Sequence, residues 1–179
     1  MIKSLIDFAA LLFCYCFFLW RRWRGEGRDI LLVKTLMYIY LSFVLFFTLM
    51  PVIASLPHLF DHSYAPMNMT PFDDFMNGRG DFIRQIALNV ILTVPFGFLW
   101  PIAADKKAGF ARTVFYTFLL SLVIEILQPL INPNRSADIT DLITNTLGGS
   151  IGYIFYALLK PAVVPLLRLV RGKTGIADK

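Results

Sequence analysis

The sequence predicts an all-α fold, a polytopic membrane bundle of five transmembrane helices, and three observations carry this prediction. First, 57% of the 179 residues are hydrophobic, only 16% are charged, and the mean hydropathy is +0.64, whereas soluble domains are about 45–50% apolar and about 25% charged. Second, five apolar runs each have about the 20 residues that a helix needs to cross the hydrocarbon of a bilayer. Third, the basic residues gather between alternate runs.

The five apolar runs occupy residues 4–20, 30–53, 82–104, 110–131 and 139–159. We interpret the first run as a retained span and not a cleaved signal peptide, because arginines follow it in place of a small-residue cleavage site. Prolines and glycines argue against a long regular helix in the loop before residue 82. The stretch 161–171 is apolar but interrupted by Pro161 and Pro165, and we expect it to lie on the membrane surface. The chain, residues 1–179, is short enough for one domain.

Twelve of the 17 lysines and arginines lie between the first and second runs, between the third and fourth runs or in the first turn of the fourth, and after the fifth run. Because cytoplasmic loops carry an excess of basic residues, we expect these segments inside the cell. The N-terminus is then outside and the C-terminus cytoplasmic, as in a multi-pass protein of the cell membrane. This topology and contact with anionic membrane lipids explain the net charge of +5. No basic–aromatic pattern indicates nucleic-acid binding.

Strongly polar side chains recur on the third, fourth and fifth runs, near the ends expected to face outward. They are Arg84, Gln85 and Asn89 on the third run, Glu125 and Gln128 on the fourth, and Arg135, Asp138, Asp141 and Asn145 at the start of the fifth. A rise of about 1.5 Å per residue places the three sets at similar depth. Ionisable groups inside a membrane are candidates for function. We therefore expect one polar pocket, open to the outer leaflet and formed by these nine residues.

Several features of these spans have a structural interpretation as well as a functional one. Interhelical hydrogen bonds through the polar residues can hold a bundle together without any ligand. Pro95, followed by Gly97, weakens the third helix, and this gives either a bend that opens the pocket or a static kink. Gly148, Gly149 and Gly152 are expected to be structural, because small residues four apart let helices pack closely within the bundle.

No metal site is predicted. His58 and His62 are four residues apart, with Asp61 between them, a spacing that zinc ligands use, but we interpret them as ordinary surface residues. Glu125, Asp138 and Asp141 offer the carboxylate oxygens that magnesium and calcium prefer, yet their spacing does not define a cation site. The sequence contains no nucleophile elbow, no P-loop and no thiol–imidazole pair, and no cofactor is expected.

The polar residues lie in blocks that resemble the VanZ-like family of membrane proteins. The resemblance is carried by NVILTVPFGF from Asn89, by EILQ from Glu125 and by RSADITDLITNTLGGSIGY from Arg135, and it covers about residues 81–153. Thr93 departs from the family pattern, which has a bulky apolar residue there, often Phe. The family is named after an accessory protein of glycopeptide-resistance clusters. The resemblance therefore implies an envelope context and a link to teicoplanin, a lipid-bearing glycopeptide, but it implies no reaction.

Three functions are compatible with these residues. In the first, the pocket binds the headgroup of a membrane lipid, a lipid-linked cell-wall precursor or a lipoglycopeptide: acids meet amines or hydroxyls, Arg84 and Arg135 meet phosphate or carboxylate, and amides fix the orientation. In the second, the protein is a membrane-embedded hydrolase or transferase of lipid-linked substrates, with Glu125 and Asp141 as the acid and base. In the third, it is a structural or assembly partner of another membrane protein. Binding without catalysis is favoured, and the oligomeric state stays open.

Overall fold

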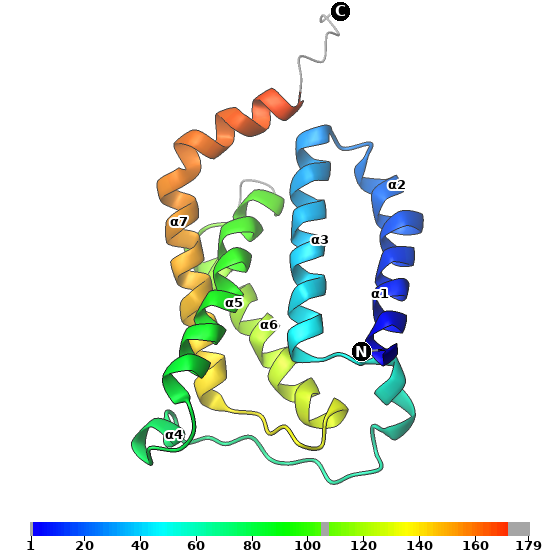
Figure 1. Cartoon of the computed structure of the whole chain (residues 1–179). Helices are drawn as coiled ribbons and strands as arrows, with labels where there is room; N and C mark the ends of the chain where they lie inside the picture. The colour runs from blue at the N-terminus through cyan, green and yellow to red at the C-terminus, as the bar shows by residue number, and fades with distance from the viewer. Residues whose placement is uncertain (1, 105–107, 172–179) are drawn as a thin grey trace, which may run out of the picture.

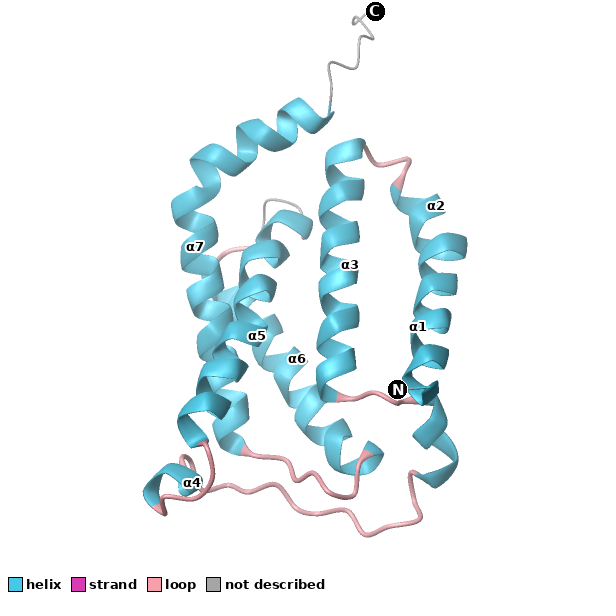
Figure 2. Ribbon diagram, viewed as in Figure 1, coloured by secondary structure: helices cyan, strands magenta, loops and turns pink. Residues whose placement is uncertain are grey.

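The computed structural model describes residues 2–104 and 108–171, and within these ranges the chain is helical and contains no strand (Figure 2). Five helical segments are long and apolar enough to cross a membrane: residues 3–23, 28–58, 82–103, 110–131 and 139–171. The predicted all-α fold with five candidate membrane spans is therefore confirmed.

The helices follow one another along the chain with short turns, apart from one long loop. In order they are α1 (Ile2–Cys14), a π-helical turn (Tyr15–Leu19), α2 (Trp20–Trp23), α3 (Arg28–Thr48), a 3-10 helix (Ile53–His58), the single turn α4 (Asp73–Met76), α5 (Phe82–Ala103), α6 (Phe110–Ile131) and α7 (Ile139–Arg171). Helices α5, α6 and α7 form the packed centre, α3 lies beside them, and α1 stands at the edge (Figure 1).

The bundle has two different ends (Figure 1). The loop end carries the N-terminus and the segments 49–81 and 132–138. The basic end carries the turn between α2 and α3 and the last part of α7. This arrangement matches the alternation expected from the basic residues, although Lys106, Lys107, Lys173 and Lys179 lie outside the described residues. Which end faces the cytoplasm stays a prediction from the charge pattern.

The second span differs from its prediction, because the regular helix ends at Thr48 and not near residue 53. Pro51 lacks an N–H group and restricts the residue before it, so a helix ends easily here. The next two N–H groups, of Val52 and Ile53, both donate to the carboxylate of Asp7 on α1, each at 2.9 Å. Asp7 is only 4% exposed. This buried carboxylate therefore holds the segment that follows the end of α3 in place.

The last span also differs, because α7 does not stop near residue 159. It runs unbroken to Arg171, with Pro161 and Pro165 inside it. Each proline removes one backbone hydrogen bond and crowds the preceding turn, which bends a helix without ending it. Figure 1 shows α7 turning across the basic end of the bundle. We call residues 160–171 the C-terminal arm.

The backbones of α5 and α7 are in direct contact through glycines. A Cβ added to Gly97, Gly148 or Gly152 would overlap the backbone of the facing helix. Gly149 faces α6 instead, where an added Cβ would overlap the side chain of Thr117. Helices in membranes approach closely where small residues line the contact. The glycines therefore bring α7 against both α5 and α6 within one chain.

We expect Gly152→Ala to destabilise the protein by roughly 1–3 kcal/mol, because the added methyl group must displace the backbone of α5. Thermal unfolding of the purified protein in detergent, followed by tryptophan fluorescence, measures this effect. Gly109→Ala is the matched control, because nothing lies within 4 Å of a Cβ at that position. Equal unfolding temperatures for the two variants would contradict the close contact.

Candidate functional site

Helices α5 and α7 are joined by polar contacts at two levels near the loop end. Asn89 of α5 donates from Nδ2 to Oδ1 of Asp141 on α7, at 2.6 Å. One turn deeper, the hydroxyl of Thr93 donates to the backbone carbonyl of Asn145, also at 2.6 Å. Both contacts depend on the close glycine packing just below them. The first one holds the carboxylate of Asp141 in a fixed orientation.

Helix α6 contributes a buried carboxylate that binds the start of α7. Oε2 of Glu125 accepts the backbone N–H of Asp138 at 3.0 Å, and Glu125 is only 1% exposed. One turn deeper, Asn145 donates from Nδ2 to Oγ of Ser121 at 2.9 Å. Because the first N–H groups of a helix have no partner within it, a side chain or water has to satisfy them. Glu125 supplies that partner at the entry to α7.

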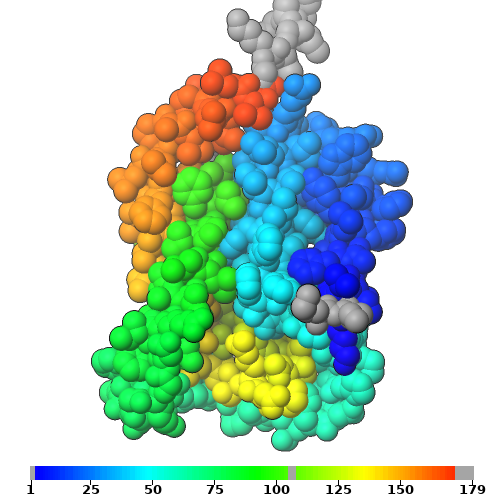
Figure 3. Space-filling view, in the orientation of Figure 1, coloured from blue at the N-terminus to red at the C-terminus, as the bar shows by residue number. Residues whose placement is uncertain are grey.

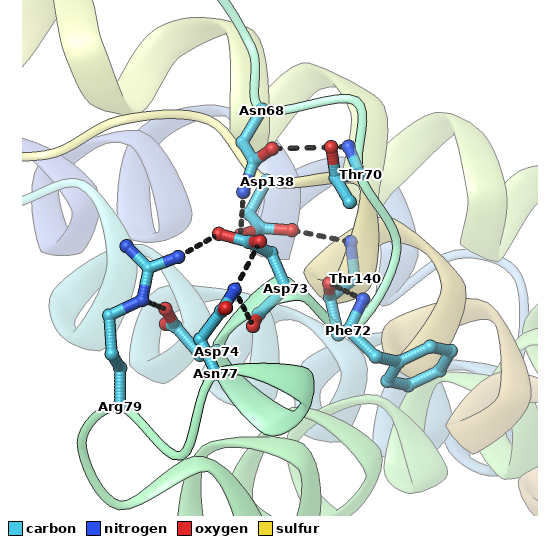
Figure 4. Close-up of polar contacts among 9 residues, drawn as sticks. All are labelled: Asn68, Thr70, Phe72, Asp73, Asp74, Asn77, Arg79, Asp138 and Thr140. Atoms are coloured by element: carbon cyan, nitrogen blue, oxygen red, sulfur yellow. Dashed lines mark hydrogen bonds and ion pairs between the residues drawn. The ribbon is translucent and has the colours of Figure 1, made fainter.

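Asp138 itself caps α7 and joins it to the long loop (Figure 4). Its Oδ1 accepts the N–H of Thr140 at 2.7 Å, the usual contact of an aspartate that precedes a helix. Its Oδ2 accepts a longer bond, 3.4 Å, from the side-chain amide of Asn68 in the loop. The carboxylate of Asp138 is therefore shared between the helix that it caps and the loop that crosses it.

The loop is attached to α7 mainly through backbone groups. Asn68 donates its N–H to Ala137 at 2.9 Å and accepts the N–H of Ile139 at 3.0 Å, which forms an isolated parallel bridge around Asp138. Four residues on, the N–H of Phe72 donates to Oγ1 of Thr140 at 2.9 Å. We call residues 68–77 the loop strap, because this segment is bound across the first turn of α7.

The far part of the loop strap is held by its own ion pairs. The guanidinium of Arg79 contacts the carboxylate of Asp73 and lies 3.8 Å from that of Asp74 (Figure 4). Asn77 donates its side-chain amide to Asp73 as well, at 2.8 Å. Phe72, which precedes this turn, adopts a left-handed φ of 57°, a conformation that is strained for a bulky residue. These contacts fix the turn α4 beside α5 and α7.

A polar cleft lies between the loop strap, α5 and α7. It is lined by three carboxylates, an amide, a hydroxyl, three aromatic rings and an isoleucine, namely Asp74, Asp138, Asp141, Gln85, Thr140, Phe72, Phe75, Phe82 and Ile86. The cleft has a volume of about 20 Å³, which is enough for one or two water molecules. Carboxylates beside aromatic rings suit a ligand that donates hydrogen bonds or carries positive charge. A whole headgroup requires the loop strap to move outward.

Three of the nine predicted pocket residues line this cleft: Gln85, Asp138 and Asp141. Asn89 is bonded to Asp141 and so supports one wall of the cleft. Glu125 and Asn145 are buried behind this wall and do not line the cleft. The structure therefore separates residues that can touch a ligand from residues that position them.

The other three predicted residues are placed differently. Gln128 is buried, but its amide is directed to α3, where Nε2 lies 3.4 Å from the carbonyl of Thr48. Arg84 and Arg135 are exposed, and among the described residues neither forms an ion pair with Glu125, Asp138 or Asp141. The cleft itself is therefore acidic, with both arginines outside it.

The two loop histidines have separate partners. Nδ1 of His58 lies 2.7 Å from a carboxylate oxygen of Asp61, whereas Nε2 of His62 lies 2.8 Å from the carbonyl of Pro129 at the end of α6. Throughout residues 2–104 and 108–171, no three His, Cys, Asp or Glu side chains are grouped so as to hold a metal ion.

Five residues that line the cleft or anchor a loop were not identified as site or anchor residues from the sequence: Asp7, Asn68, Phe72, Asp74 and Thr140. For two of them the sequence contains a pattern that could have identified them. Asp7 is an acid inside an apolar run, which by itself indicates a buried partner, and Thr140 follows an aspartate at the start of a helix, the position of a capped N–H. Asn68, Phe72 and Asp74 belong to an irregular loop, whose path no periodicity predicts.

We expect Glu125→Ala to loosen the start of α7, because it leaves the partly buried N–H of Asp138 without its partner, at a cost of about 1 kcal/mol or more. Glu125→Gln keeps an acceptor oxygen there and should stay close to the parent. The measurement is the rate of trypsin cleavage after Arg135, mapped by mass spectrometry on the protein in micelles. Faster cleavage in the Gln variant than in the Ala variant would be inconsistent with this role.

The comparisons with known proteins agree on one family. The VanZ/LLP1 family model matches residues 8–160. A relative, Protein VanZ of Enterococcus faecium, is 34% identical over 128 residues, which cover 72% of this chain and 75% of the relative. No solved structure matches the chain. On the family match and this identity, the chain belongs to the VanZ/LLP1 family.

Proposed function

We propose that this VanZ/LLP1 family protein binds the headgroup of an amphiphile in the cleft at the loop end of its bundle. The candidate ligands are a membrane lipid, a lipid-linked cell-wall precursor and a lipoglycopeptide. One observation supports this function above the others: Asp74, Asp138 and Asp141 line one cleft together with Gln85 and three aromatic rings. The cleft lies where helices that can cross a membrane end, the depth at which headgroups are found.

The lining favours a headgroup that carries an amine or several hydroxyls. A carboxylate binds an ammonium group through charge-assisted hydrogen bonds, which are about twice as strong as neutral ones. Aromatic rings add attraction for a cation that lies against their faces. Gln85 has an amide that both donates and accepts, so it can fix the orientation of the ligand. Arg84 and Arg135, exposed outside the cleft, are available for the phosphate or carboxylate of the same ligand.

Acid–base catalysis by Glu125 and Asp141 has less support than binding. Asp141 lines the cleft, but Glu125 is buried behind it and its carboxylate is bonded to the N–H of Asp138. A general base has to come within hydrogen-bond reach of the proton that it removes. A role for Glu125 in positioning Asp138 agrees better with these contacts.

The charge pattern supports an orientation in which the loop end faces outward from a bacterial plasma membrane. A ligand would then enter the cleft from the outer leaflet, where wall precursors and glycopeptide antibiotics are found. The link between the VanZ-like family and teicoplanin makes a lipid-bearing glycopeptide one natural probe. Phosphatidylethanolamine, which carries an ammonium group, is the corresponding lipid probe.

Asp141→Asn and Asp138→Asn test the cleft directly, because each substitution keeps the shape of the side chain and removes its negative charge. We expect each to weaken binding of a cationic headgroup about 10-fold or more, the effect of losing a charge-assisted contact of roughly 1.5–3 kcal/mol. Native mass spectrometry of the protein, titrated with phosphatidylethanolamine or teicoplanin, measures the affinity. Folding is checked on the same samples by thermal unfolding.

Asp61→Asn is the matched control, because Asp61 is an exposed acid of the same loop that does not line the cleft. It should bind both probes as the parent does. If all three variants bind equally, or if neither probe binds the parent above the level of phosphatidic acid, which carries no amine, the cleft is not a headgroup site.

A further inference from the structure

Helix α7 is longer than a membrane requires. Its 33 residues amount to about 50 Å at 1.5 Å per residue, whereas the hydrocarbon of a bilayer is about 30 Å thick. The excess falls in the C-terminal arm, residues 160–171. Figures 1 and 3 show the arm lying across the basic end of the bundle, beside the start of α3. The arm therefore crosses the end of the bundle and does not continue along the axis of α7.

One face of the arm is docked on the bundle. Leu167 lines a groove together with residues of α3 and α5, among them Val33 and Ile102. Farther along, Nε of Arg171 lies 3.6 Å from Oδ1 of Asp29, at the start of α3. These contacts fix which side of the arm faces inward, and hence which side faces outward.

The arm carries exposed leucines together with exposed cations. Leu166 is 61% exposed and Leu169 is 77% exposed, one helical turn apart. Lys160 and Arg168 are exposed as well and form no ion pair with any described residue. A helix with exposed leucines and exposed basic residues is the type that lies in a membrane interface, especially one with anionic lipids.

Helix α2 and Arg24, which follows it, place membrane-interface residues at the same end. The guanidinium of Arg24 lies 4.8 Å from the ring of Trp20, and Trp and basic residues together mark the headgroup level of a bilayer. The described acids at this end, Glu26 and Asp29, are already paired with Lys34 and Arg171. Among the described residues at this end, Arg24, Lys160 and Arg168 form no ion pair with an acid. Negative charge from lipid phosphates would complement them.

We propose that the C-terminal arm and the end of α2 form a binding surface for anionic phospholipid headgroups. Leu166 and Leu169 insert among the first methylene groups of the lipid chains, and Lys160, Arg168 and the arginines of α2 contact the phosphates. Each cation near such a surface contributes about 1 kcal/mol. This surface lies at the opposite end from the cleft, so neither proposal depends on the other.

The test uses a fluorescent reporter on the arm. Cys14 and Cys16 are changed to Ser, Leu169 is changed to Cys and labelled with bimane, and the protein is reconstituted in phosphatidylcholine vesicles. Brominated phosphatidylglycerol or brominated phosphatidylcholine is then added at equal mole fraction, and quenching gives the relative affinity of the two lipids for the arm. We expect blue-shifted emission and a clear preference for phosphatidylglycerol. Leu166→Cys provides a second reporter position.

Charge variants decide whether the arm's cations cause the preference. Lys160→Gln and Arg168→Gln should each lower it about fivefold, which corresponds to about 1 kcal/mol per charge. Lys3→Gln is the matched control, an exposed lysine at the other end of the first span, and should leave the preference unchanged. Equal quenching by both lipids, water-like emission at both reporter positions, or an equal effect of Lys3→Gln would each overturn the proposal.

Discussion

The contact between the backbones of α5 and α7 is the constraint on which the rest of the structure depends. Gly97, Gly148 and Gly152 let the two helices meet without intervening side chains. Only at that distance can the short side chain of Asn89 reach Asp141, at 2.6 Å. In a membrane, where apolar side chains gain nothing by leaving lipid for protein, such packing and hydrogen bonds have to supply the association energy. The carboxylate that lines the cleft is thus positioned by the same contact that holds the bundle.

Much of the fold could be predicted from the sequence, because a membrane leaves few alternatives for an apolar run of about 20 residues. The span predicted over 110–131 has the observed bounds, and the third span differs by one residue. The two largest differences at span ends both involve proline. At Pro51 a distant carboxylate, Asp7, replaces the helical partners, so α3 stops early. At Pro161 and Pro165 the helix only bends. Whether a proline ends or bends a helix depends on contacts that a local pattern does not contain.

The candidate site was predictable in part, for a related physical reason. Helical spacing placed Asn89, Glu125, Asp141 and Asn145 near one another, and their hydrogen bonds join three helices at similar depth. The spacing of residues along a helix does not determine which neighbouring helix each face contacts, so it could not predict that Gln128 is directed toward α3. The position of the loop strap could not be predicted either. Its bridge at Asn68 consists of backbone hydrogen bonds, which do not depend on side-chain type. The sequence thus indicated the helical walls of the cleft but not the segment that covers it.

Headgroup binding in the cleft can be observed in a cryo-electron microscopy map of the protein in nanodiscs that contain phosphatidylethanolamine, with a bound antibody fragment to give it size. We expect headgroup density between the loop strap, α5 and α7, in contact with Asp138, Asp141 and Gln85, and a loop strap that is shifted outward. A map that shows only water in this cleft, with ordered headgroups elsewhere on the protein, would contradict headgroup binding there.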